Sequence, residues 1–262
     1  MTKSISVILF GAGGVGLALL RQLVNGRSRI AERVGCRFEV VAVADSRSWL
    51  FAPQGLPDAD LLALIARKEA GGRVSTGQER PSSLEIINQV AEAGIEQAIV
   101  VDVTAVSGME PALDRAIELG YGVALASAQP YFSHPQVRHE STVGGGQPVI
   151  ATLRYLLDVS DPIFEIEGQM SGTLGYICAE LDKGVPFSAA VREAKARGYT
   201  EPDPRDDLSG ADVMRKVMIL GRMAGWPLEV DDIEVESLYP EAMAGLSVAD
   251  FLEQLPKLDE AM

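Results

Sequence analysis

The sequence predicts an α/β protein in which a domain built on a parallel β-sheet precedes a mainly α+β domain. Apolar stretches typical of buried strands alternate with stretches of helical period up to residue 126. A run of glycines follows the first of these predicted strands. Beyond residue 149 the pattern changes to helices, interrupted by one apolar stretch that predicts a strand.

The first domain is expected to span residues 1–135. Its predicted strands cover residues 5–10, 38–44, 98–103 and 122–126. Its predicted helices cover residues 15–24, 58–70, 83–93 and 111–119. The pair Asn25 and Gly26 predicts the end of the first helix, because glycine favours helix C-termini. Strands that alternate with helices in this way form parallel sheets through right-handed crossovers.

The second domain is expected to span residues 136–262. Its helical stretches predict helices at residues 149–157, 174–182, 188–197 and 211–223. The apolar stretch at residues 163–170 predicts its strand.

Composition narrows the function classes. The chain has 262 residues and a formal net charge of −14, from 37 acidic and 23 basic side chains. A field of this sign repels polyanions, so nucleic acid and anionic membrane surfaces are not expected as partners. No apolar stretch approaches the ~20 residues of a membrane helix. The two cysteines, Cys36 and Cys178, lack a CxxC spacing, which argues against a disulfide framework and makes the reducing cytoplasm the expected location.

The glycine run reads GAGGVG at residues 11–16 and fits the pattern G-x-G-x-x-G between a strand and a helix. In dinucleotide-binding domains of the Rossmann type, the first glycine permits the tight turn, the second admits a pyrophosphate and the third lets the helix pack on the strand. The helix N-terminus then favours the negative charge of the phosphates. The run therefore predicts a site for NAD or NADP with these cofactor-binding residues: Gly11, Gly13, Gly14, Val15 and Gly16.

Three further residues are predicted to border this cofactor. Asp45 ends the second strand, where a carboxylate accepts hydrogen bonds from the adenosine ribose. Arg47 follows closely and suits the 2′-phosphate of NADP, so the choice between NAD and NADP stays open. Thr104 follows the strand at residues 98–103, at the sheet edge where open α/β folds bind ligands. A threonine in that place also serves simply to cap the next segment.

Asp212 and Lys216 lie four residues apart on a predicted helix, so their side chains emerge from one face and can act on one ligand. Such a pair is also common as an ordinary ion pair on a helix surface. The acidic segment at residues 201–207 precedes them and supplies carboxylates that suit the ammonium group of an amino acid. The combination favours a site for a small zwitterionic substrate.

Four segments together resemble the homoserine dehydrogenase family in sequence, order and spacing. They read ESTVGGGQP at residues 140–148, GQMSGTLGY at 168–176, GYTEPDPRDDLSG at 198–210 and ADVMRK at 211–216. The resemblance covers nearly the whole chain. It implies reversible NAD(P)-dependent oxidation of L-homoserine to L-aspartate 4-semialdehyde, a step of threonine and methionine biosynthesis. It also implies a homodimer formed through the second domain.

The resemblance assigns roles to particular residues. Glu201 and Tyr199 contact homoserine, Thr173 borders it, and Asp212 hydrogen-bonds the reacting hydroxyl. Lys216 either accepts the hydroxyl proton or stabilises charge that develops on the oxygen, and the sequence does not separate these roles. The Ser-Gly-Thr turn that contains Thr173 is also a common helix-start signal.

The resemblance further implies a monovalent cation, sodium, in the loop at residues 140–147. Its expected ligands are the side chain of Glu140 and the backbone carbonyls of Val143, Gly145 and Gln147. A glycine-rich hinge between the domains accounts for the same residues, and the two interpretations are compatible.

Two features depart from the family's pattern. After the strand at residues 122–126 the family usually has Asn-Lys-x-Pro, whereas this chain reads SAQP at residues 127–130. Ser127 is still placed at the cofactor, but Ala128 stands where the family has a lysine beside the reacting hydroxyl. If that lysine moves the proton, its loss predicts turnover lower by roughly 10²–10⁴-fold. The chain also ends at Met262, where the family continues back to the first domain.

Three functions therefore stay open from the sequence. The leading one is a homoserine dehydrogenase. The second is an NAD(P)-dependent oxidoreductase of the same scaffold with a different substrate. The third is a catalytically impaired protein that binds nucleotide or amino acid.

Overall fold

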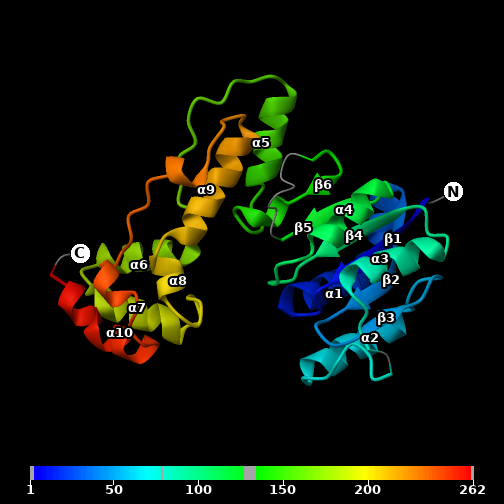
Figure 1. The fold of residues 1–262 in the computed structure, drawn as a ribbon, viewed down its shortest axis with the longest axis horizontal. Coiled ribbons are helices and arrows are strands. Elements are labelled where there is room, and N and C mark those ends of the chain that lie inside the picture. Colours follow the sequence, from blue (N-terminus) through cyan, green and yellow to red (C-terminus); the bar gives the residue numbers. More distant parts are fainter. Residues whose placement is uncertain (1–2, 78, 127–133, 261–262) are drawn as a thin grey trace. The chain divides into compact units, whose positions relative to one another are not determined.

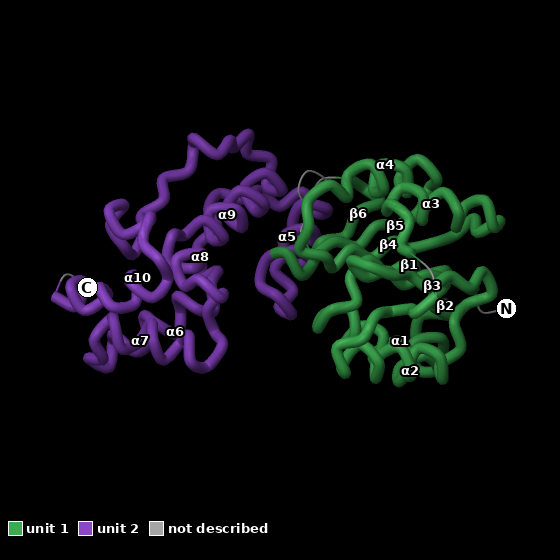
Figure 2. The backbone as a smooth tube through the Cα atoms, turned by 60° about the horizontal axis from the view of Figure 1, so that its bottom comes forward, with its two compact units in different colours: residues 1–142 green, residues 143–262 purple. Residues whose placement is uncertain are grey.

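The computed structural model describes residues 3–77, 79–126 and 134–260. The chain divides into two compact units, residues 1–142 (unit 1) and 143–262 (unit 2), and each has hydrophobic clusters of its own (Figure 2). The boundary expected between residues 135 and 136 falls inside unit 1.

Unit 1 is built on one sheet, which in the described residues has six strands in the order β3-β2-β1-β4-β5-β6 (Figure 1). The strands are β1 (Lys3–Phe10), β2 (Cys36–Ala44), β3 (Trp49–Phe51), β4 (Ala98–Asp102), β5 (Gly122–Leu125) and β6 (Val137–Arg138). Neighbouring strands are parallel, except that β3 runs antiparallel to β2. This is the strand order of Rossmann-type nucleotide-binding sheets, so the predicted fold class is confirmed.

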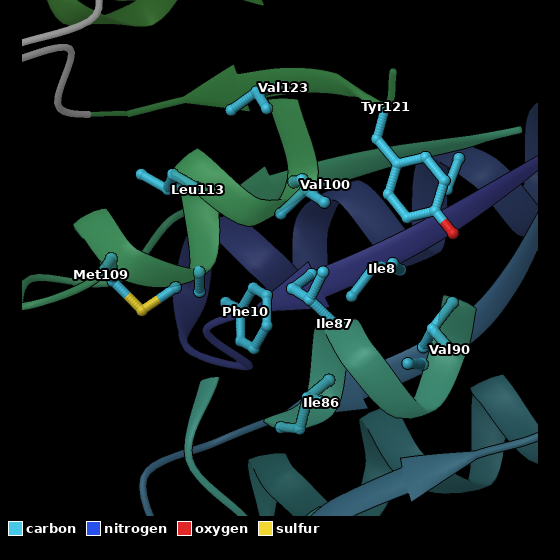
Figure 3. Packing of buried hydrophobic residues seen from close by; sticks show 14 of the residues in the cluster. Ile8, Phe10, Ile86, Ile87, Val90, Val100, Met109, Leu113, Tyr121 and Val123 are labelled. Atoms are coloured by element: carbon cyan, nitrogen blue, oxygen red, sulfur yellow. The ribbon is translucent and has the colours of Figure 1, made fainter. Parts of the chain in front are cut away.

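Helices cover both faces of this sheet. They are α1 (Gly14–Val34), α2 (Asp58–Glu69), α3 (Ser83–Glu92) and α4 (Glu110–Glu118). Ile8 and Phe10 of β1 pack with α3 and α4, as Figure 3 shows, whereas Val7 and Leu9 pack with α1 and α2. Because both faces are buried, β1 is apolar at successive positions, as is typical of strands in parallel sheets.

The first helix runs past its predicted end. Gly26 lies inside α1 and is buried, so the expected end at Asn25 and Gly26 is wrong. A Cβ at Gly26 would lie 3.3 Å from Cδ1 of Ile30, which places this glycine at a tightly packed point of the helix. The helix ends instead at Gly35, which has a left-handed φ of 72° and donates its N–H to the carbonyl of Ala31.

In the described residues of unit 2 the regular secondary structure consists of helices alone, where the sequence predicted an α+β domain. Its helices are α5 (Val149–Asp158), α6 (Gly172–Leu181), α7 (Phe187–Ala196), α8 (Arg205–Leu208), α9 (Ala211–Met223) and α10 (Val248–Gln254). Short 3-10 helices occur at Glu140–Thr142 in unit 1 and at Val230–Asp232, Glu241–Met243 and Leu255–Leu258 in unit 2. α5 and α9 pack together around Ile150 and Leu220, while α6, α7 and α10 pack around Phe187 and Phe251.

The strand predicted at residues 163–170 is wrong, because this segment has no regular secondary structure. A strand forms only where a neighbouring strand accepts and donates its backbone hydrogen bonds. No strand is assigned elsewhere in the described part of unit 2, so the apolar pattern has no ladder to join there.

A search of the described residues for a helix with the length and apolar character needed to cross a bilayer finds none.

Candidate functional site

The glycine turn between β1 and α1 has the geometry that a phosphate site requires. Gly11 has a φ of 100°, and a Cβ there would lie 2.9 Å from the carbonyl oxygen of Val103. A Cβ on Gly16 would lie only 1.9 Å from the carbonyl oxygen of Gly11. In contrast, a Cβ on Gly13 or Gly14 would meet nothing within 4 Å. The turn is therefore closely packed beneath and open at the start of α1, which fits a bound pyrophosphate.

A pocket of about 540 Å³ adjoins this turn. Besides the turn it is lined by Asp45 and Ser46 at the end of β2, by Thr104 after β4, and by two basic side chains, Lys68 and Arg80. Its volume lies in the range of small-molecule sites. The carboxyl ends of the parallel strands meet here, which is where open α/β sheets bind nucleotides.

Four other described residues predicted for the cofactor do not line this pocket: Gly14, Val15, Gly16 and Arg47. Gly16 packs beneath the turn against Gly11. Val15 is 65% exposed in the first turn of α1, next to Gly14. The side chain of Arg47 is not among those that line the pocket either. Their contact with the cofactor stays a prediction.

Asp45 is held by the protein itself. Its Oδ1 accepts hydrogen bonds from the amide N–H of Arg47 at 2.9 Å, and from the amide and the hydroxyl of Ser48 at 2.8 and 3.1 Å. Its Oδ2 accepts from Nζ of Lys68 at 2.8 Å and from the amide of Val74 at 3.0 Å. Burial raises the pKa of this carboxyl, but the hydrogen bonds from Lys68 and from the three amides outweigh burial and hold the pKa well below its usual range.

Thr104 is fixed by a carboxylate two residues earlier. Its amide and its hydroxyl both donate to Oδ1 of Asp102, at 3.0 and 2.7 Å. This turn, which directly follows β4, is the local capping role considered for the threonine, and it also places Thr104 in the lining of the nucleotide pocket. The two roles are compatible.

In unit 2, Asp212 and Lys216 form the ion pair that their spacing predicts. Nζ of Lys216 lies 2.6 Å from Oδ2 of Asp212 and donates to the carbonyl oxygen of Met170 at 2.8 Å. The lysine side chain is 20% exposed and that of Asp212 is 55% exposed. This pair differs from an ordinary surface ion pair, because the lysine also joins α9 to the segment that precedes α6.

A second pocket, of about 520 Å³, lies at Lys216 within unit 2. Gln169, Met170 and Ser171 form one part of its lining, and Gly145 and Gln147 form another. Ser171 is the N-cap of α6, because its hydroxyl accepts from the amide of Leu174 at 3.2 Å. Since these segments line one pocket together with the ammonium group of Lys216, the arrangement can orient and polarise a small polar ligand.

Thr173 and Tyr199 are brought together by a short hydrogen bond. The hydroxyl of Thr173, which is 8% exposed, donates to the carbonyl oxygen of Tyr199 at 2.6 Å. The ring of Tyr199 packs edge-on against Tyr176, with centroids 5.1 Å apart. Glu201 is exposed, and its amide donates to Oδ2 of Asp207 at 2.8 Å. These three residues do not line the pocket at Lys216, so their contact with a substrate stays a prediction.

Two predictions are not tested by the structure. Ser127, like Ala128, lies outside the described residues. The predicted sodium ligands are divided between the units, since Glu140 belongs to unit 1 and Val143, Gly145 and Gln147 belong to unit 2. Gly145 has a left-handed φ of 58°, and the carbonyl oxygen of Gln147 accepts from the amide of Val149 at 2.9 Å.

Several residues that line the pockets were not predicted from the sequence. Among them are Lys68 and Arg80 in unit 1 and Gln169 and Met170 in unit 2. For Gln169 and Met170 a signal existed, because both lie in the segment at residues 168–176. No motif marks Lys68 or Arg80, and only the folded structure brings them to the pocket of unit 1.

Comparisons with known proteins agree with this geometry. The family model described as homoserine dehydrogenase matches residues 148–261. The homoserine dehydrogenase of Saccharomyces cerevisiae is 33% identical over 279 residues, which cover 99% of this chain and 74% of the yeast protein.

The chain belongs to the homoserine dehydrogenase family. The resemblance stated from the sequence is thereby confirmed. A chloroplastic bifunctional aspartokinase/homoserine dehydrogenase 2 of Zea mays is 35% identical over 269 residues, which cover 98% of this chain and 29% of the maize protein. The chain therefore spans less than a third of the length of this bifunctional relative.

Solved structures share the fold of this chain. A Candida auris protein of unknown function is 31% identical and superposes with a TM-score of 0.83, covering 99% of this chain and 74% of that one. A hyperthermophilic archaeal homoserine dehydrogenase in complex with NADPH shares the fold at 24% identity and a TM-score of 0.63, covering 84% of this chain and 70% of that one.

Proposed function

We propose that this chain interconverts L-homoserine and L-aspartate 4-semialdehyde with NAD(P). The observation that carries the proposal is the position of Lys216. Its ammonium group lies in the lining of a polar pocket of unit 2, between a carboxylate of Asp212 at 2.6 Å and the carbonyl oxygen of Met170 at 2.8 Å. A lysine fixed in this way is suited to act on an oxygen atom of a bound substrate.

The reaction removes a hydride from the carbinol carbon of homoserine and a proton from its hydroxyl, which leaves an aldehyde. When bound, the oxidised nicotinamide accepts that hydride. An ammonium group has three N–H donors, and Lys216 directs two of them to Asp212 and Met170. The third N–H of the ammonium group serves the substrate oxygen, where it stabilises developing negative charge. Asp212 holds the lysine in place and takes the hydroxyl proton as the hydride leaves. Because its side chain is 55% exposed, the proton can pass on to water.

The amino-acid end of the substrate needs groups of its own. We assign the substrate ammonium to the exposed carboxylate of Glu201, whose backbone is held by Asp207. We also assign substrate contact to Tyr199, whose backbone carbonyl is held by the hydroxyl of Thr173. A carboxylate and a phenol two residues apart on one segment suit a zwitterion better than a neutral alcohol.

The nucleotide belongs to the pocket of unit 1. Gly13 and Gly14 admit the pyrophosphate at the start of α1, Gly11 and Gly16 shape the turn, and Val15 lies beside it. Asp45, Arg47 and Thr104 border the site, and we place Ser127 there on the family pattern. The same proposal includes a homodimer and a sodium ion bound by Glu140, Val143, Gly145 and Gln147. Light scattering during gel filtration tests the dimer. A comparison of activity in sodium buffer and in choline buffer tests the cation.

The decisive experiment is a spectrophotometric assay of the purified chain, with homoserine and each nucleotide in turn. Lys216→Ala is expected to lower kcat by roughly 10²–10⁴-fold, because it removes the group that acts on the reacting oxygen. The Kd of the nucleotide should stay within about twofold. Lys183→Ala is the matched control, since Lys183 is 64% exposed and pairs only with Glu180 on α6 among the described residues.

Each result bears on the assignment. The proposal is supported if the unmodified chain oxidises homoserine, Lys216→Ala abolishes this turnover and Lys183→Ala retains it. Nucleotide binding without any homoserine oxidation, even at high enzyme concentration, overturns it in favour of the impaired or substrate-shifted alternative. That alternative is favoured by Ala128, where the family has a lysine.

A further inference from the structure

The carboxylate that is expected to meet the adenosine ribose is already occupied. A carboxylate offers about four lone-pair sites on its two oxygens. Asp45 accepts five hydrogen bonds from the protein, three at Oδ1 and two at Oδ2, all between 2.8 and 3.1 Å. A ribose diol would have to displace one of these donors to bind Asp45. The side chain therefore anchors the pocket wall and is not available to a nucleotide.

The negative charge of Asp45 is also balanced. Nζ of Lys68, at the end of α2, lies 2.8 Å from Oδ2, and the side chains are 19% and 9% exposed for Lys68 and Asp45 respectively. An aspartate free of such a partner repels a 2′-phosphate and thereby selects NAD. Because Lys68 compensates the charge here, that repulsion is largely removed.

Arg80 supplies positive charge to the same pocket without a compensating acid. Its Nη2 donates to the hydroxyl of Ser83 at 2.7 Å, and its Nε is buried and has no hydrogen-bond partner among the described residues. No carboxylate of the described residues forms an ion pair with it, and it lines the pocket together with Ser46. A buried guanidinium N–H with no acceptor is costly, and an anionic oxygen satisfies it.

We propose that the nucleotide pocket of unit 1 selects NADP(H) over NAD(H), and that Arg80 is the specificity-determining residue, which binds the 2′-phosphate. The inference rests on the proposed function for the presence of a nucleotide. It goes beyond it by naming the form of the cofactor and the residue that selects it. Asp45 and Lys68 are positioning residues in this site, because they hold the wall and cancel each other's charge.

Isothermal titration with NADP⁺, NAD⁺ and 2′,5′-ADP measures this selectivity without any catalytic step. The unmodified chain is expected to bind NADP⁺ more tightly than NAD⁺, and to bind 2′,5′-ADP. Arg80→Ala should weaken the binding of NADP⁺ and 2′,5′-ADP by roughly 10- to 100-fold, the effect of losing a charge-assisted hydrogen bond. The Kd of NAD⁺ should stay within about twofold. Arg80→Lys keeps the charge but not the planar fork, so it should give intermediate affinities and serves if the alanine variant does not fold.

Arg21→Ala is the matched control. It removes the same charge from unit 1, but Arg21 is 43% exposed and pairs with Glu69 on the surface. Equal weakening of NAD⁺ and NADP⁺ by Arg80→Ala overturns the inference, because it indicates a structural role. Tighter binding of NAD⁺ than of NADP⁺ by the unmodified chain overturns it as well, as does the absence of binding by either nucleotide.

The proposed function and this inference can fail separately. Selective NADP⁺ binding without homoserine oxidation supports the role of Arg80 and contradicts the proposed dehydrogenase activity. Homoserine oxidation with a preference for NAD⁺ supports that activity and overturns the proposed selectivity for NADP⁺.

Discussion

Alanine at Gly16 should lower the stability of unit 1, whereas alanine at Gly13 should lower nucleotide affinity, although both residues belong to one motif. A Cβ on Gly16 would lie 1.9 Å from the carbonyl oxygen of Gly11, about 1.5 Å closer than an ordinary contact of ~3.4 Å. The atoms on both sides are backbone, and α1 is fixed by the buried Leu17 and Leu20. Overpacking of this kind costs typically 1–3 kcal/mol, and we expect about 3 kcal/mol here. For a unit of this size the melting temperature should fall by about 6–12 °C.

Gly13 lies at the N-cap of α1 with an extended backbone, at φ −92°, and a Cβ there meets no protein atom within 4 Å. Alanine restricts the unfolded chain, which stabilises by about 0.4–1 kcal/mol, and is a poorer N-cap than glycine by a similar amount. The free energy of unfolding should therefore change by less than about 0.5 kcal/mol. The methyl group would occupy the space of the pyrophosphate, so nucleotide affinity should fall roughly 10- to 100-fold.

Thermal unfolding by circular dichroism and isothermal titration with both nucleotides measure the two effects on the same samples. Unchanged nucleotide affinity in Gly13→Ala would refute a phosphate at this turn. Unchanged melting in Gly16→Ala would refute the packing argument, since no room for its Cβ exists without movement of Gly11 or α1.

Two further perturbations test the site through stability. Thr173→Val removes the buried hydrogen bond to the carbonyl of Tyr199, so denaturant titration should show a free energy of unfolding lower by about 1 kcal/mol. KM for homoserine should rise more than kcat falls. An unchanged KM would show that Tyr199 does not contact the substrate. Because the folded protein holds the pKa of Asp45 below its usual range, ionised Asp45 stabilises the fold above the unfolded-state pKa of ~3.9, and this contribution declines as pH falls towards the folded pKa. Asp45→Asn should therefore lower stability at neutral pH and flatten the loss of stability below about pH 4, and parallel pH courses of the two proteins would contradict this account.

Sequence pattern located those elements whose signals are local. The helix predicted at residues 211–223 has those bounds in the structure, and α2 and α3 each end within a residue of expectation, since period and caps lie within each segment. β3 and β6 were not predicted. They span three and two residues, which is too short for an apolar period, and only their pairing with β2 and β5 defines them as strands.

The functional residues divide in the same way. Spacing alone placed Asp212 beside Lys216, and the glycine motif placed the turn, because both depend on neighbours in sequence. The partner of Asp45 was not predictable from its strand, since Lys68 comes from the end of α2. The sequence around an aspartate at the end of the second strand does not reveal whether the carboxylate faces a ribose or five donors of the protein. Only the fold distinguishes these two cases.

The acidic net charge and a phosphate-binding pocket are consistent with each other on physical grounds. The formal charge of −14 is spread over the chain, and at physiological ionic strength charges beyond about 8 Å are largely screened. A compact phosphate in the pocket therefore responds mainly to the nearest groups, where the charges of Asp45 and Lys68 cancel and that of Arg80 remains. An extended polyanion would lie against many acidic side chains at once, so its repulsion adds up along its length. The expected absence of nucleic acid among the partners and the proposed dinucleotide site are therefore compatible. Because added salt screens Arg80, it should weaken the binding of NADP⁺ more than the binding of NAD⁺.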